Sequence, residues 1–457
     1  MADFADRLRA VLAPEKVLDG DAVGEDMAHD EALTVPGRRP DAVVVPTCAE
    51  DVAAVVRLAA GEGVPVTARG AGTGLCGACV PRAGGVVVAF DRMSSILEVD
   101  TDNHVAVVEP GVRLDQLDAG LAGSGLVYPV YPGETTSSIG GNIGTNAGGM
   151  RAVRHGVTRH HVLGLQAVLG TGEILRSGGR YVKSTSGYDL TQLIVGSEGT
   201  LAIVTEATLR LHPRIPHAAT LLAPFPNLSA VTAAVPPIVA SGVQPTILEY
   251  VDAISMAGIT SAAELDLGVP RGVQERALAY LVVVVEERTP QRLDESVEHL
   301  GALVAGLGAL DVYVLPAGAA TALVEARERA FFAAKAAGAD DIVDCVVPRA
   351  RIADYLARVA ALAEATGSLV VGCGHAGDGN VHLSVFQRDA ESRGRLVRDI
   401  LAAGVELGGA VSGEHGIGTA KLAAYLELED PAKLALMRRI KAAFDPAGIL
   451  NPGVLLP

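Results

Sequence analysis

The sequence predicts an α+β protein of more than one domain. The chain opens with apolar strands and helices in β-α-β order, two glycine-rich stretches follow, and near residue 217 the pattern changes to long Ala/Leu/Val-rich helices between apolar strands. With 457 residues the chain is long enough for two or three substantial cores. A composition that is 49% hydrophobic and 20% charged is typical of a globular protein.

The helices and strands of the first half are predicted from the spacing of apolar residues and from the Gly and Pro residues between apolar segments. The N-terminal residues alternate charged and apolar groups as an amphipathic helix does. A strand is expected at 42–46, and Thr47 to Glu50 matches a capping box that opens a helix to about residue 61. The remaining elements are expected as strands at 64–68, 85–90 and 104–109, a short helix at 114–125, a hairpin of 162–169 with 173–176, and a strand at 207–211.

Two glycine-rich stretches, 69–78 and 137–149, suggest the walls of one cofactor site. Glycine is costly in a packed helix or strand, so this composition favours a loop that approaches a flat or phosphate-bearing ligand closely. A flexible linker is the alternative, but Ile139, Ile143 and Ala147 recur every four residues, which implies packing. Neither stretch has the spacing of a Rossmann or Walker A loop.

Three histidines and a glutamate in the second half suggest a metal site. His375 and His382 flank a Gly/Asp/Asn-rich turn that would bring their rings together, and Glu414 and His415 lie in a second loop. Two histidines with one carboxylate form a three-ligand catalytic zinc set, and His415 is left as a base. Ordinary hydrogen-bonding loop residues are the alternative. Arg327, in an Ala-rich helix, is either a carboxylate ligand or a solvated charge.

Bulk properties exclude several partners and locations. The net charge is −16, with no basic run and no Trp, so nucleic acid is not expected to bind. Five scattered cysteines favour a reducing compartment, and Cys76 and Cys79 are interpreted as small loop residues instead of zinc ligands. Without an apolar segment of ~20 residues, we expect a cytoplasmic protein with at most peripheral membrane association.

These motifs together resemble the FAD-linked 2-hydroxyacid dehydrogenases of the vanillyl-alcohol-oxidase superfamily, which include the glycolate oxidase flavin subunit, D-lactate dehydrogenase and D-2-hydroxyglutarate dehydrogenase. The resemblance rests on residues 67–74, 139–149, 196–201, 375–382, 412–418 and 444–453. It implies an N-terminal helical segment at 1–37, a two-part FAD-binding domain of the PCMH type at 38–214, an α+β cap domain at 215–430, and a C-terminal segment at 431–457 that returns to the FAD domain.

The resemblance also assigns roles. The cofactor-binding residues that it implies are Arg69, Gly70, Ala71, Gly72, Thr73, Gly74, Leu75, Pro132, Gly133, Ser138, Gly141, Asn142, Thr145, Gly148, Glu198, Ile203 and Asn451. It makes His375, His382 and Glu414 the ligands of a divalent metal, zinc by donor type, with His415 as base and Arg327 on the substrate carboxylate. FAD is expected to bind noncovalently, because Thr73 stands where some relatives attach the flavin through His.

The implied reaction is hydride transfer from C2 of a 2-hydroxy acid to the flavin. Electrons would then pass to an acceptor such as a quinone, an electron-transfer flavoprotein, a cytochrome or an iron–sulfur subunit. Phe331, Ile342 and Ser384 stand where the 2-hydroxyglutarate branch has Thr, Lys and Asn. This difference favours a small monocarboxylate such as D-lactate or glycolate, or an acid with an apolar tail. His155 replaces an expected Tyr.

Three other functions remain open on the sequence alone. A non-catalytic FAD subunit of a larger oxidase would keep the flavin loops without cap chemistry, although His375, His382, Glu414 and His415 are all present. A zinc hydrolase would use the same ligands without a flavin. An FAD enzyme of the ether-lipid synthase type would catalyse no net oxidation.

Overall fold

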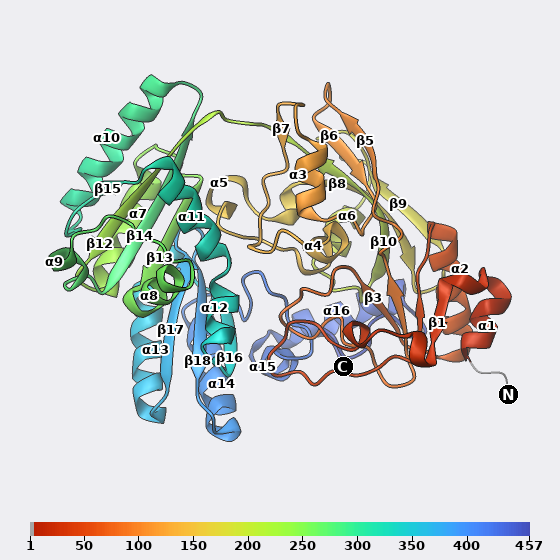
Figure 1. Ribbon diagram of the computed structural model, residues 1–457. Coiled ribbons are helices and arrows are strands. Elements are labelled where there is room, and N and C mark those ends of the chain that lie inside the picture. Colours follow the sequence, from red (N-terminus) through yellow and green to blue (C-terminus); the bar gives the residue numbers. More distant parts are fainter. Residues whose placement is uncertain (1–3) are drawn as a thin grey trace.

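The strands form two sheets and a short ribbon in the N-terminal half and one large sheet in the C-terminal half. This computed structural model describes residues 4–457. The two halves lie side by side, with the large sheet in green to blue and the N-terminal half in red to yellow (Figure 1). The mixture of helices and strands agrees with the predicted α+β class.

The first sheet is four-stranded, in the order β1 (Val17–Asp19), β2 (Ala42–Val44), β4 (Val86–Ala89), β3 (Val66–Arg69). Strands β2, β4 and β3 are parallel, and α2 (Ala49–Glu62) is the crossover helix that such strands need. Helix α1 (Phe4–Val11) buries Phe4 and Leu8 in the same core. Residues 1–37 therefore contribute more than a helix, because β1 pairs with β2.

The capping box expected before α2 is wrong. The residue at the cap is Cys48, and its side chain makes no capping hydrogen bond. Instead, the backbone N–H and hydroxyl of Thr47 both donate to the carboxylate of Asp51, at 2.8 and 3.1 Å. Lys16 donates to the same carboxylate oxygen at 2.6 Å. A charged acceptor held by Lys16 therefore binds both donors of Thr47, the residue before the cap.

The second sheet is antiparallel and five-stranded. Its order is β5 (Ile96–Asp100), β6 (Val105–Val108), β10 (Ala202–Arg210), β8 (Val162–Leu169), β9 (Ile174–Gly178). Helices α3 (Leu114–Gly120), α4 (Ile139–Thr145) and α6 (Leu190–Ile194) contribute buried residues to its core. The ribbon pairs β7 (Leu126–Val127) with β11 (His212–Pro213). The hairpin β8–β9 lies where the sequence predicts it, whereas β5 was not predicted.

The sequence suggested that the glycine-rich stretch 137–149 is a loop. In the structure, part of this stretch is helical. It contains helix α4, and the Ser138 hydroxyl accepts a hydrogen bond from the Gly141 N–H at the helix start. Ile139 and Ile143 are both fully buried, so their four-residue spacing reflects helix packing. A Cβ on Gly140 would lie 2.7 Å from Pro110 Cβ. Glycine is retained in this helix because a neighbouring backbone lies against it.

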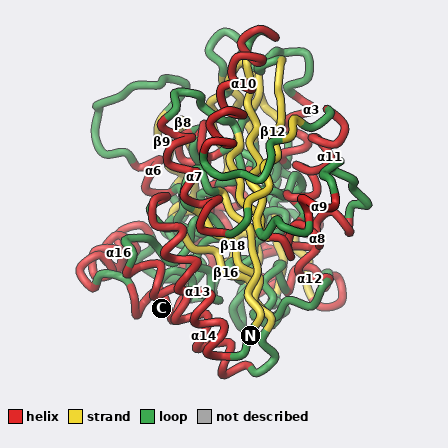
Figure 2. The backbone as a smooth tube through the Cα atoms, turned by 90° about the vertical axis from the view of Figure 1, so that its left-hand side faces the viewer, coloured by secondary structure: helices red, strands yellow, loops and turns green. Residues whose placement is uncertain are grey.

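The large sheet has seven antiparallel strands. Their order is β15 (Tyr313–Val314), β12 (His217–Phe225), β14 (Ala279–Glu287), β13 (Ile247–Asp252), β17 (Leu369–His375), β18 (Asn380–Phe386), β16 (Asp341–Val346). One face packs on α7 (Leu228–Ala240), α10 (Pro290–Gly306), α13 (Ile352–Thr366) and α14 (Ala390–Glu406). The other face carries α8 (Ala253–Ala262), α11 (Ala317–Glu328) and α12 (Ala330–Ala336), on the opposite side of the strands in Figure 2.

The C-terminal residues lie against the first sheet. After α15 (Leu422–Leu428) and α16 (Pro431–Phe444), the Val66 N–H donates to the Ile449 carbonyl at 2.8 Å and the Asn451 N–H donates to the Val66 carbonyl at 2.8 Å. This contact places blue elements beside red ones in Figure 1. Among the described residues, every helix is too short or too polar to cross a bilayer.

Candidate metal and flavin site

Four ionisable side chains lie in a row across four adjacent strands of the large sheet. Strand register places Asp344 of β16 opposite His382 of β18, and His382 opposite Cys373 of β17. His375 lies two residues beyond Cys373 and therefore on the same face, as does Glu249 of β13. This is the face that carries α8, α11 and α12. Alternation along each strand thus sets the row apart from the apolar core on the other face.

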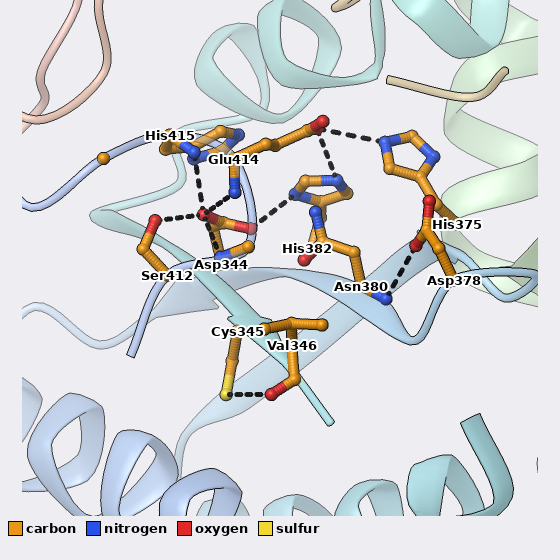
Figure 3. A network of polar contacts seen from close by, with 12 residues as sticks. Asp344, Cys345, Val346, His375, Asp378, Asn380, His382, Ser412, Glu414 and His415 are labelled. Atoms are coloured by element: carbon orange, nitrogen blue, oxygen red, sulfur yellow. Dashed lines mark hydrogen bonds and ion pairs between the residues drawn. The ribbon is translucent and has the colours of Figure 1, made fainter. Parts of the chain in front are cut away.

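The predicted ligands converge at one end of this row. The loop carrying Glu414 brings one carboxylate oxygen to 3.0 Å from His375 Nε2 and 3.1 Å from His382 Nε2 (Figure 3). The tight turn after β17 holds the two imidazole rings 4.8 Å apart. Three ligand atoms that lie within 4.8 Å of one another are able to bind one ion. Two histidines with one glutamate are one of the donor sets that hold zinc at catalytic sites.

Asp344, His382 and His415 form a second group whose possible ligand atoms lie within 4.8 Å of one another. The positive charge of Lys421 lies beside this group. One oxygen of Asp344 accepts hydrogen bonds from the Ser412 hydroxyl at 2.6 Å and from three successive backbone N–H groups, including that of His415 at 2.9 Å. Lys421 lies 3.6 Å from the same oxygen. Asp344 therefore holds the 412–415 loop in place and lies behind His382, at 3.8 Å.

Glu249 supports His375 from the other side. The Nδ1 of His375 lies 2.6 Å from one Glu249 oxygen, and the other oxygen lies 2.7 Å from the guanidinium of Arg327. All three side chains are buried. Arg327 therefore reaches the site instead of solvent. Its Nη2 forms the ion pair with Glu249, whereas its Nε is buried without a hydrogen-bond partner among the described residues. The Nε group is therefore free to donate to a carboxylate.

Burial and neighbouring charges shift the pKa values in this network. Burial alone would raise the pKa of Asp344, but the positive charges of His415, Lys421 and His382 hold it well below its usual range. Burial lowers the pKa of His415 to about 4. Since His415 is then neutral near pH 7, Lys421 is the lasting counter-charge of Asp344. His415 stacks on His382 with ring centroids 5.0 Å apart.

A cavity of about 210 Å³ lies between the two glycine-rich stretches. Most of the predicted cofactor residues line it, namely Gly70, Ala71, Gly72, Thr73, Gly74, Leu75, Pro132, Gly133, Ser138, Gly141, Asn142, Thr145, Glu198, Ile203 and Asn451. The stretches touch directly: the Ala71 N–H donates to the Ser138 hydroxyl at 3.3 Å, and a Cβ on Gly70 would collide with that oxygen.

The lining of this cavity fits a bound flavin nucleotide. The Asn142 amide nitrogen and the Ser137 hydroxyl are buried there without a hydrogen-bond partner among residues 4–457. Buried polar atoms are rarely left unpaired in proteins, so these two groups point to a polar ligand. Ala68, Phe90 and Ile203 supply an apolar wall for flat rings.

Two predicted cofactor residues lie outside this cavity. Arg69 packs behind the loop, where it donates to the His29 carbonyl at 2.7 Å, and a Cβ on Gly72 would collide with its guanidinium. Gly148 faces the metal site, because a Cβ there would lie 2.6 Å from a Glu414 oxygen. Arg69 therefore supports the loop from behind, and Gly148 makes room for the glutamate.

Glu198 and Asn451 line the cavity but also join distant segments. The Glu198 carboxylate accepts hydrogen bonds from the Ile417 and Gly418 N–H groups at 2.8 and 2.7 Å. The Asn451 amide donates to the Glu198 carbonyl at 2.8 Å and to the Ala78 carbonyl at 2.9 Å. Burial raises the pKa of Glu198 to about 7. The flavin cavity is thus tied to the loop that carries Glu414 and His415.

A second cavity, of about 460 Å³, begins at the metal ligands. It is lined by Arg327, His375, His382, Glu414 and His415, and it passes between α8 and α12. The three positions that depart from the 2-hydroxyglutarate pattern, Phe331, Ile342 and Ser384, all line it. The two cavities adjoin, since Leu75, Pro132, Gly133, Glu328, Phe331, Glu414 and His415 line both. Glu414 and His415 therefore lie where the two cavities meet, and His375 and His382 line the second cavity.

His155 lies away from both cavities, in a cluster of buried rings. Its ring centroid is 5.5 Å from that of His212, which lies 5.1 Å from that of His161, and Tyr128 packs against His161. Burial lowers the pKa of His155 to about 4 and that of His161 to about 3. The histidine that replaces the expected tyrosine at position 155 is therefore one of a cluster of neutral imidazoles.

The residues that hold the candidate ligands in place belong to no motif of the sequence. Glu249, Asp344 and Lys421 are buried charges next to the site, and none was singled out. The signal of the two acids is a carboxylate with apolar neighbours on both sides inside a strand: Glu249 lies between Leu248 and Tyr250, and Asp344 lies between Val343 and Cys345. An isolated acid in a buried strand requires a partner, so such positions near histidine motifs mark second-layer residues.

Comparisons with known proteins identify the family. One family model, for an FAD binding domain, matches residues 40–178, and another, for the C-terminal domain of FAD linked oxidases, matches residues 215–455. The chain belongs to the FAD-linked oxidases, which confirms the resemblance seen in the sequence.

Three relatives match over nearly full length. The chain is 56% identical to an uncharacterized FAD-linked oxidoreductase of Mycobacterium tuberculosis, over 100% of this chain and 99% of the relative. It is 37% identical to a D-lactate dehydrogenase of Anaerostipes hadrus, over 97% and 95% of the two chains. It is also 37% identical to a glycolate oxidase subunit of Bacillus subtilis, over 99% and 96%.

Solved structures share the fold at low identity. p-Cresol methylhydroxylase superposes with a TM-score of 0.79 at 17% identity, over 99% of this chain and 96% of its own. Alkyldihydroxyacetonephosphate synthase superposes with a TM-score of 0.74 at 19% identity, over 98% and 84%. The predicted PCMH-type fold class is therefore confirmed.

Proposed function

We propose that this chain oxidises a 2-hydroxy acid to the 2-oxo acid, with noncovalent FAD as the hydride acceptor and a divalent metal, zinc by its donor set, held by His375, His382 and Glu414. The observation that carries the proposal is the position of these ligands at the junction of the flavin cavity and the second cavity. The D-lactate dehydrogenase and glycolate oxidase relatives support the substrate class.

Each residue of the site has a separate role in the proposed oxidation. Arg327 binds the substrate carboxylate, and Glu249 orients both Arg327 and His375. His415, which lines both cavities, takes the hydroxyl proton as the carbonyl forms. When bound, the metal lowers the pKa of the hydroxyl, and the flavin accepts the C2 hydrogen with its electron pair. The two electrons removed from the acid would pass through the flavin to an external acceptor.

Anaerobic titration of the purified FAD protein tests this proposal. D-Lactate, L-lactate, glycolate and D-2-hydroxyglutarate are added separately while the flavin absorbance is recorded. We expect bleaching by a monocarboxylate, loss of bleaching after a chelator, and recovery with zinc. His382→Ala should abolish bleaching, whereas His299→Ala on the exposed surface of α10 should not. A flavin that none of the acids bleaches contradicts the proposal.

A further inference from the structure

The cavity beyond the metal ligands is a groove between two helices. It runs from His375 and His382 across the face of the large sheet, with α8 on one side and α12 on the other. Ile254, which is 59% exposed, lines its outer part. We call this space the α8–α12 groove. It connects the metal ligands with the molecular surface.

The walls of the groove are apolar along most of its length. Ile254 and Ile259 of α8 face Phe331 and Ala334 of the α12 side, and Ile342 and Phe386 belong to the sheet. Arg327 is the one Lys or Arg side chain among the described residues that line the groove, and it lies beside the metal ligands. A second carboxylate in the groove would be desolvated without a cationic partner.

The volume of the groove exceeds the need of a short acid. A volume of about 460 Å³ is room for about 15 water molecules, at ~30 Å³ for each water in the liquid, and lactate has only a handful of heavy atoms. Once the hydroxyl and carboxylate of a substrate lie at the metal ligands and Arg327, most of the apolar space remains unfilled. Water in such a space gains few hydrogen bonds from the walls, so an aliphatic chain replaces it favourably.

We propose that the preferred substrate is a 2-hydroxy monocarboxylic acid whose aliphatic tail of several methylenes lies in the α8–α12 groove. This inference rests on the proposed oxidation and names its substrate class more narrowly. The tail contacts the helices and the sheet, while the hydroxyl and carboxylate stay at the ligands and Arg327. Short acids such as lactate are then slower substrates, and dicarboxylates are rejected.

A chain-length series tests the groove. Lactate, 2-hydroxybutyrate, 2-hydroxyhexanoate and 2-hydroxyoctanoate, each as the D isomer, are compared by kcat/KM with a dye acceptor. Each added methylene should raise kcat/KM about fourfold, which corresponds to about 0.8 kcal/mol per buried methylene. A kcat/KM that stays level or falls with length, while lactate still reduces the flavin, overturns the inference and leaves the proposed oxidation standing.

Two substitutions locate the tail. Gly258→Leu on α8 fills the groove, and a Cβ at this position meets no atom within 4 Å, so the helix accepts it. Gly394→Leu on α14 is the matched control, because Gly394 is an equally open helical glycine on the other side of the sheet. The ratio of kcat/KM for the eight-carbon acid to that for lactate should fall at least about tenfold in Gly258→Leu only. Equal ratios in both variants overturn the inference.

Calorimetry gives a result that does not depend on turnover. Octanoate and propionate, which lack the hydroxyl and cannot be oxidised, are titrated into the protein loaded with FAD and zinc. Octanoate should bind more tightly with a more negative heat-capacity change, and Gly258→Leu should remove the difference. If no hydroxy acid reduces the flavin, the proposed oxidation fails, and this titration alone then decides whether the groove holds an aliphatic chain.

Discussion

The Nδ1 of His375 donates a hydrogen bond to the carboxylate of Glu249, 2.6 Å away, in a region that solvent does not reach. The other ring nitrogen, Nε2, then lies 3.0 Å from a carboxylate oxygen of Glu414, on the side of the ring that faces His382. A carboxylate behind a histidine fixes the ring orientation and strengthens it as a ligand. Glu249 is therefore part of the candidate metal site, together with His375, His382 and Glu414.

Replacing Glu249 by Gln should weaken zinc binding about 10- to 100-fold, because the histidine loses its charged acceptor and Arg327 loses its counter-charge. Competition with a chromogenic chelator measures the affinity, and flavin content should stay unchanged. Glu287→Gln, at the end of β14 and away from the ligands, is the control. Unchanged zinc affinity in Glu249→Gln would show that His375 is oriented by its backbone alone.

Replacing Asp344 by Asn should lower the free energy of unfolding by about 3–5 kcal/mol, because Lys421 is then a buried charge without a partner. The amide also accepts fewer of the hydrogen bonds that hold the 412–415 loop. Urea unfolding measures the loss, with the more exposed Asp354→Asn as control. A difference between the two variants below about 1 kcal/mol would refute the assignment of Asp344 as the anchor of this loop.

Replacing Gly70 by Ala should lower FAD affinity, since the new methyl group collides with the Ser138 hydroxyl and separates the two glycine-rich stretches. Such overpacking costs about 1–3 kcal/mol. Flavin release during dialysis and thermal unfolding report the two effects. In contrast, Gly61→Ala in α2, where a Cβ meets no atom within 4 Å, should stabilise the protein slightly and retain the flavin. Full flavin retention in Gly70→Ala would argue against a shared wall.

Acid should destabilise the protein through the buried histidine cluster. The pKa of His161 is about 3 in the folded chain, so between pH 6.5 and 3 the unfolded state binds a proton that the folded state does not. Stability is therefore lost as pH falls from 6.5, by up to about 1.4 kcal/mol per pH unit. His161→Phe should flatten this dependence in urea unfolding at several pH values. If the free energy of unfolding changes with pH equally in His161→Phe and in the exposed His299→Phe, protonation of His161 is not the cause of the acid destabilisation.

The fold class and the candidate ligands could be predicted because their signals are local. Valine-rich runs such as Val86–Ala89 indicate buried strands. The Gly, Asp and Asn residues between His375 and His382 predict the turn there. The helix α4 was missed because glycine content outweighed the four-residue spacing of Ile139 and Ile143. That glycine content reflects contacts with Pro110 and other distant segments.

What the sequence could not give is the set of contacts between distant strands. Glu249 and His375 are separated by 126 positions, and Glu198 and Gly418 by 220. Register and loop packing bring these pairs together, and neither is encoded in a short motif. The α8–α12 groove has the same origin, since its lining comes from segments spread from residue 75 to residue 415.

The row Glu249, His375, His382 and Asp344 takes one residue from each of four neighbouring strands. If any one of these strands slipped by a single position, its acid or imidazole would turn into the apolar layer under α13 and α14. A chain with a shifted strand would therefore lose the cluster of His375, His382 and Glu414 and would also carry an unsolvated charge. The alignment of these four strands is thus fixed by polar contacts as well as by the apolar core.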